Sequence, residues 1–226
     1  MKLNPIILAL DVSTVSEASV IVDRVGSACE FYKVGMELYA AGGMDFVDNL
    51  TREGKQVFLD MKFYDIGETV KRAVAQVAGR GVRFLTVHGS SAVMRAAVEG
   101  KSGSDLQLLG VTVLTSFDES DLRDLGYPCS VQDLIALRVR NAMAAGVEGI
   151  VCSPLEAAMV RQLAGPNAIL VTPGVRSAGA GVGDQKRVAT PREAMNNGAN
   201  YLVVGRQVTR AANPRAAVEQ ILQELR

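Results

Sequence analysis

The chain has 226 residues, a length that suits one large domain or two small ones. Apolar residues make up 48% of it and charged residues 21%, so a sizeable core can form in an ordinary globular protein. Because 24 basic residues balance 24 acidic ones, a general attraction to nucleic acid or to an anionic membrane is excluded, and any bound anion needs a local site.

The start of the chain, MKLNPIILALD, has one lysine followed by a short apolar run that ends at Asp11. The run is too short for the core of a signal peptide or for a membrane span, so we predict a first buried strand. The three cysteines, Cys29, Cys129 and Cys152, have no CxxC spacing and are expected to be reduced thiols. These features predict a cytoplasmic protein.

Short apolar runs rich in Val, Ile and Leu then recur along the whole chain. Continuous rather than alternating hydrophobicity predicts strands covered on both faces, as in parallel sheets. The predicted strands are Ile6–Leu10, Phe31–Val34, Val57–Leu59, Phe84–Val87, Leu108–Leu114, Gly149–Cys152, Ile169–Val171 and Tyr201–Val204.

Segments with helical spacing lie between these runs. The first clear example places Val70, Ala73, Val74 and Val77 on one helical face, and the last segment repeats the pattern with Val218, Ile221, Leu222 and Leu225. Asn213 is the expected N-cap of that last helix, with Pro214 at its first position, where the missing N–H has no cost.

Strict alternation of strands and helices predicts parallel strands joined by right-handed crossovers. Eight repeats in residues 1–226 favour one single-domain (β/α)8 TIM barrel, an α/β fold. The alternative is a doubly wound open sheet, which typically has a GxGxxG turn after its first strand; here that turn reads ALDVSTVSE.

Polar residues gather where the predicted strands end, which in such a barrel is where chemistry occurs. The clearest case is FLDMKFYDIGET, in which Asp60 and Lys62 are two residues apart on a strand and should face the same side. Asp65 follows past the strand end, and Lys33 and Asp11 stand at neighbouring strand ends. Nearby carboxylates favour a protonated lysine, which suits a proton donor. The alternative is a buried ion pair that only closes the barrel mouth.

A second candidate is a phosphate site after the last two strands. There the chain reads TPGVRSAGAGVGDQKR and VVGRQVTR. In the second segment Gly205 allows close approach of a ligand, and the guanidinium of Arg206 offers several hydrogen-bond donors in one plane. Barrels of this class usually bind phosphate at these two loops. A lid with solvated charges is compatible with the same pattern.

His88, the only histidine, is expected to pack rather than to catalyse. The absence of an HxH or HExxH cluster favours a metal-free reaction.

With these motifs, the chain resembles the orotidine 5'-monophosphate decarboxylase family over nearly its whole length. The matching segments are ALD at Ala9–Asp11, FYKVGMEL from Phe31, DMKFYDI from Asp60, VLTS from Val113, TPGVR from Thr172, GDQKR from Gly183 and VVGRQVT from Val203. DxKxxD is shared with sugar-phosphate decarboxylases and hexulose-phosphate synthases, which depend on magnesium, whereas the later series is specific to the nucleotide enzyme.

The resemblance implies a cofactor-free homodimer that decarboxylates orotidine 5'-monophosphate in pyrimidine biosynthesis. It makes Lys62 the proton donor to C6, puts Asp60 near the substrate carboxylate, and brings Asp65 in from the partner subunit. The remaining residues implied in substrate binding are Asp11, Lys33 and Thr69 near the ribose, Ser153 at the base, Gln185, Gly205 and Arg206 at the phosphate, and Ile66, Thr115, Pro173 and Arg176.

One departure concerns the segment after Asp65. The family commonly has proline and asparagine where this chain has Gly67 and Glu68. The glycine is expected to loosen the segment and to free it to extend outward, which would change the placement of Thr69. Two other functions remain open from the residues: a sugar-phosphate enzyme on the same barrel, and a non-catalytic nucleotide-binding barrel.

Overall fold

The computed structural model describes residues 4–177 and 189–225. Its strands form a closed parallel barrel in chain order, with β8 pairing back onto β1. The strands are β1 (Ile6–Ala9), β2 (Phe31–Gly35), β3 (Gln56–Phe63), β4 (Phe84–Val87), β5 (Gln107–Val111), β6 (Gly149–Val151), β7 (Ile169–Thr172) and β8 (Tyr201–Val204). The predicted (β/α)8 barrel is thereby confirmed.

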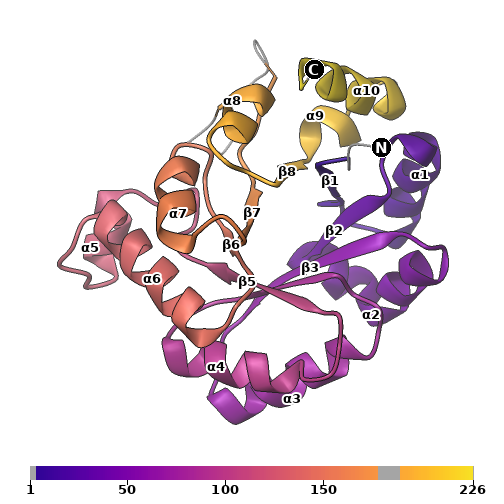
Figure 1. Cartoon of the computed structure of the whole chain (residues 1–226). Helices are drawn as coiled ribbons and strands as arrows, with labels where there is room; N and C mark the ends of the chain where they lie inside the picture. Colours follow the sequence, from indigo (N-terminus) through magenta and orange to yellow (C-terminus); the bar gives the residue numbers. More distant parts are fainter. Residues whose placement is uncertain (1–3, 178–188, 226) are drawn as a thin grey trace.

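Helices surround the strands on the outside, and the two ends of the chain lie side by side where α10 packs on α1 (Figure 1). Asn213 caps α10 and Pro214 begins it, as predicted. The helices are α1 (Val15–Val25), α2 (Met36–Arg52), α3 (Gly67–Ala78), α4 (Ser91–Gly100), α5 (Glu119–Asp124), α6 (Val131–Ala145), α7 (Ala157–Ala164), α8 (Pro191–Asn196), α9 (Arg206–Thr209) and α10 (Pro214–Glu224), with a 3-10 turn at Gly26–Ala28. Within the described residues, none of them combines the length and apolar character needed to cross a membrane.

Two hydrophobic clusters hold the fold together. The larger one joins the outer faces of the strands to the helices. The smaller one consists of strand residues alone, so it fills the inside of the barrel. Phe31, Phe58 and Phe84 lie at its centre, with ring centroids of Phe31 and Phe84 5.2 Å apart. Arg83 lies against this cluster, over the ring of Phe84. The interior beneath the strand ends is therefore packed, and a ligand has room only above it.

The structure corrects two expectations about local elements. The predicted strand Leu108–Leu114 ends at Val111, because its neighbour β6 is short and their pairing ends at Val111 and Val151. Gly67 does not loosen the segment after Asp65: it is the first residue of α3. A Cβ at Gly67 would come within 3.3 Å of the Cβ of Ala96, so the glycine lets α3 pack closely on α4.

Candidate active site

Two charged residues of the site lie two positions after interior phenylalanines in the same strands. Lys33 follows Phe31 in β2, and Asp60 follows Phe58 in β3. Side chains two apart on a strand share a face, so both polar residues point to the inside of the barrel above the packed rings. Lys33 is 8% exposed. Burying charge in this way is costly unless the groups are paired, and these groups are.

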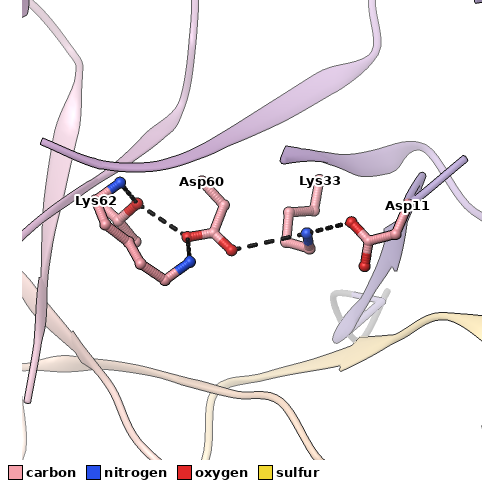
Figure 2. A network of polar contacts seen from close by, with 5 residues as sticks. Asp11, Lys33, Asp60 and Lys62 are labelled. Carbon is pink, nitrogen blue, oxygen red and sulfur yellow. Dashed lines mark hydrogen bonds and ion pairs between the residues drawn. The ribbon is translucent and has the colours of Figure 1, made fainter. Parts of the chain in front are cut away.

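The charged side chains form one continuous chain of alternating sign (Figure 2). Lys33 Nζ lies 2.7 Å from Asp11 Oδ1 and 3.7 Å from Asp60 Oδ2. Lys62 Nζ donates to Asp60 Oδ1 at 2.8 Å. We call Asp11, Lys33, Asp60 and Lys62 the charged tetrad. The predicted cluster of these four residues is thus assembled within one chain, with Asp60 between the two ammonium groups.

The ionisation of Asp60 follows from these contacts. Burial alone would raise the pKa of this carboxyl, but the positive charges of Lys33 and Lys62 and hydrogen bonds from Lys62 and Thr86 hold it below its ordinary value. Asp60 is therefore a carboxylate near neutral pH. A fixed negative charge beside two fixed positive charges suits a reaction in which charge moves from one group to another.

Lys62 reaches Asp60 from an irregular stretch of β3. The register between β3 and β4 shifts between Leu59 and Phe63, and Lys62 has a φ of 49°. Among the described residues other than glycine, no other has a positive φ. Simple strand alternation therefore predicted the Lys62–Asp60 contact but not the backbone that makes it. Strained backbone of this kind collects at functional sites.

A cavity of about 460 Å³ opens above the tetrad. Its wall comes from the ends of several strands and the loops that follow them. Besides the tetrad, the predicted site residues on this wall are Thr115, Pro173, Arg176, Gly205 and Arg206. The volume is in the range that holds a nucleotide-sized ligand.

The charges on the wall favour an anionic ligand. Two carboxylates, Asp11 and Asp60, face it, and both are already paired with lysines. Arg176, Arg206 and Arg210 add positive charge near the ends of β7 and β8. A ligand with an anionic group at that end would place its remainder toward the tetrad, on the side of β1–β3.

Three predicted site residues lie outside this wall, and all belong to the segment after β3. Asp65 and Thr69 are exposed, and Ile66 is 75% exposed. Asp65 accepts a hydrogen bond from the amide of Ile66 at 2.6 Å. Among the described residues, no ion pair joins Asp65 to a lysine of its own chain. The predicted site residues of this segment therefore lie on the surface of the described chain and not on the cavity wall.

Two further predicted residues also lie elsewhere. Ser153 is fully buried and is not among the residues that line the cavity, and its Oγ has no hydrogen-bond partner in the described part of the chain. The structure therefore does not bring Ser153 to the cavity, whereas Ser116 does line it. Gln185, the predicted phosphate contact in GDQKR, falls outside the described residues.

Sequence reasoning missed two residues near the tetrad and the phosphate end. Thr86 is buried in β4, and its hydroxyl contacts Asp60. Its signal was a single hydroxyl in the otherwise apolar run Phe84–Val87. Arg210 lines the cavity one turn after Arg206, and the spacing in VVGRQVTR could have revealed it. In the ranges 4–177 and 189–225, no group of three or more His, Cys, Asp or Glu residues could hold a metal ion.

His88 follows β4 and packs edge-on against Tyr64, with ring centroids 5.9 Å apart. Burial, together with the positive charges of Arg138 and Lys62, lowers the pKa of His88 from 6.5 to about 4. The imidazole is therefore neutral in the folded chain at pH 7. This agrees with the predicted packing role, since a neutral ring in a half-buried position needs no counter-charge.

A pH dependence of stability follows for His88. Between pH 6.5 and about 4 the unfolded chain binds the proton and the folded chain does not, so stability falls as the pH is lowered through this window. We expect the melting temperature of the wild type to drop more steeply there than that of His88→Gln, measured by circular dichroism. Parallel curves for the two proteins would contradict a neutral His88.

The chain matches a known family and its members. The family model described as "Orotidine 5'-phosphate decarboxylase / HUMPS family" matches residues 4–221. An orotidine 5'-phosphate decarboxylase of a Bradyrhizobium species is 51% identical over 220 residues, covering 97% of this chain and 90% of the relative. One of a Caulobacter species is 50% identical over 226 residues, covering 100% and 99%. A crystal structure of the enzyme from Lactobacillus acidophilus superposes with a TM-score of 0.87 at 34% identity, covering 98% and 99%.

Proposed function

Because the chain belongs to the orotidine 5'-phosphate decarboxylase / HUMPS family, we propose that its charged tetrad carries out the decarboxylation of orotidine 5'-monophosphate to uridine 5'-monophosphate. The chain is a lyase of pyrimidine biosynthesis. The observation that carries the assignment to this site is the pairing of Asp60 with Lys33 and Lys62 below a cavity with three arginines on its wall.

In the proposed reaction, the bond between C6 of the pyrimidine and its carboxylate breaks, and the electron pair stays on C6 as carbon dioxide leaves. Lys62 then delivers a proton from its ammonium group to C6 and becomes a neutral amine. Before that step its positive charge stabilises the developing carbanion, which has little delocalisation of its own. The contact with Asp60 holds the ammonium group in place.

Asp60 has the second role. Its carboxylate is ionised and fixed between two lysines, and in the proposed complex it lies near the carboxylate of the substrate. Two negative charges in proximity raise the energy of the bound substrate. Loss of neutral carbon dioxide moves the substrate's charge from the carboxylate to C6, away from Asp60. Lys33 and Asp11 complete the tetrad and are proposed to contact the ribose.

We place the phosphate at the ends of β7 and β8, where Gly205, Arg206 and Arg176 line the cavity. These phosphate contacts, which we call the phosphate grip, are remote from the reacting carbon. Their binding energy therefore serves to order the site rather than to change bonds. Thr115 and Pro173 lie on the same wall. Gln185, by resemblance, belongs to this grip as well.

Arg206→Ala should weaken substrate binding more than it slows the chemical step. Loss of an arginine–phosphate contact is expected to raise KM by roughly 10- to 100-fold. Phosphite added to a substrate that lacks its phosphate tests the role directly, because the free anion can occupy the empty site. Equal activation by phosphite in the wild type and in Arg206→Ala would contradict a phosphate contact at this residue.

We also propose a homodimer in which Asp65 enters the site of the partner subunit. Support comes from the exposure of Asp65, Ile66 and Thr69, none of which is among the residues that line the cavity. We further propose a cytoplasmic location. It rests on the three cysteines, which form no disulfide bond and of which Cys29 and Cys152 are buried.

A turnover assay on orotidine 5'-monophosphate tests the function. Release of carbon dioxide and appearance of uridine 5'-monophosphate are the expected result, unchanged by a chelator. Activity on a 3-keto-sugar phosphate that a chelator abolishes would instead identify a sugar-phosphate enzyme. Tight binding of the nucleotide without turnover would identify a non-catalytic barrel.

A further inference from the structure

Thr86 connects the two residues at the centre of the proposed chemistry. It lies in β4 and is fully buried. Its Oγ1 donates to Asp60 Oδ1 at 3.0 Å and accepts from the backbone amide of Lys62 at 2.9 Å. One hydroxyl therefore uses both its donor and an acceptor position, and both partners belong to the tetrad.

The register of the barrel shows why the hydroxyl is needed there. Leu59 pairs with Leu85 and Phe63 pairs with Val87, so residues 60–62 of β3 face Thr86 alone. The surplus residues bulge, and Lys62 takes the left-handed φ of 49°. The backbone of a residue other than glycine is strained at such a φ, and this conformation persists only where the surrounding structure holds it. The bond from the Lys62 amide to Thr86 is one such restraint.

We propose that Thr86 is a positioning residue for the decarboxylation, one that holds the carboxylate of Asp60 and the strained backbone of Lys62 in register. The proposal rests on the function proposed above. Valine has the shape of threonine but can neither donate nor accept. Thr86→Val would leave the Lys62 amide without this acceptor and Asp60 Oδ1 with one donor fewer, so the ammonium group would lose its fixed place beside the reacting carbon.

The test compares Thr86→Val and Thr86→Ser with Thr112→Val as the matched control. Thr112 is also a buried threonine beside the barrel, but among the described residues its hydroxyl hydrogen-bonds only to the carbonyl of Val151, at 3.4 Å. We expect kcat of Thr86→Val to fall by roughly 10- to 100-fold with KM within about twofold, because the phosphate grip is untouched. Thr86→Ser should recover most of kcat, and Thr112→Val should lose little.

The pH profile gives a second readout. The hydroxyl of Thr86 stabilises the ionised form of Asp60, so its loss raises the pKa of that carboxyl. The acid limb of kcat should therefore move to higher pH in Thr86→Val and stay in place in Thr112→Val. A purely structural role for Thr86 would lower the amount of folded protein without moving this limb.

Several outcomes would overturn the proposal. One is a wild-type kcat in Thr86→Val, and another is a Thr86→Ser variant as slow as Thr86→Val, which would make the methyl group and not the hydroxyl responsible. If Thr86→Val does not fold, Thr86→Ser and Thr86→Ala differ by the hydroxyl alone and decide the question in its place. A wild-type chain that does not decarboxylate orotidine 5'-monophosphate would overturn the proposed function, and this proposal with it.

Discussion

Lys62→Ala should abolish decarboxylation while leaving the barrel folded. The side chain supplies both the proton for C6 and the positive charge that stabilises the carbanion. In the described structure Asp60 has ion pairs with Lys33 and Lys62 only, and Lys33 is already paired with Asp11 as well. We expect kcat to fall by at least about 10⁴-fold, because a general acid and an electrostatic stabiliser are lost together. Carbon dioxide release from saturating substrate is the measurement.

The control for Lys62→Ala is Lys55→Ala. Lys55 immediately precedes β3, at the opposite end of the strand from Lys62, and its partly buried side chain forms an ion pair with the exposed Glu30 at 3.6 Å. Its removal should leave kcat within about twofold, because the chemistry is proposed at the other end of the strand. A Lys62→Ala variant that kept about a tenth of normal kcat would have lost only about 1.4 kcal/mol of transition-state stabilisation. That is too little for the sole proton donor.

The barrel was predictable because its signal is repeated along the chain. Each buried parallel strand leaves a continuous apolar run, and the alternation with helical segments fixes the topology. The runs Phe84–Val87 and Tyr201–Val204 match the observed strands residue for residue. The run Leu108–Leu114 did not, because hydropathy reports burial and not pairing. Residues such as Val113 remain buried after their partner strand has ended.

The tetrad was predictable from charge at strand ends, but its internal geometry was not. Spacing of two placed Asp60 and Lys62 together, and the 2.8 Å contact confirms that. The bulge that gives Lys62 its positive φ depends on how many residues of β4 oppose β3, which is a long-range pairing property. Thr86 was overlooked for the same reason. A lone threonine in an apolar strand becomes informative only when its neighbour across the sheet is known.

A mixture of Lys62→Ala and Asp65→Ala, each nearly inactive alone, should regain activity. In the proposed dimer each site takes Lys62 from one subunit and Asp65 from the other. A mixed dimer then has one site with both lesions and one with neither. With random exchange about half of the dimers are mixed, so roughly a quarter of all sites should be intact by the symmetry of a two-fold interface. The measurement is kcat per site after exchange, which native mass spectrometry of a tagged partner verifies.

The matched control is a mixture of Lys62→Ala with Lys33→Ala. Both lysines contact Asp60 of their own chain, so each site of the mixed dimer still carries one lesion and no site is intact. This mixture should stay inactive under the same exchange conditions. If subunits exchange and the Lys62→Ala and Asp65→Ala mixture is as inactive as this control, Asp65 serves the site of its own chain. Recovery in the first mixture alone would assign Asp65 to the partner's site, because only that pairing puts both lesions in one site.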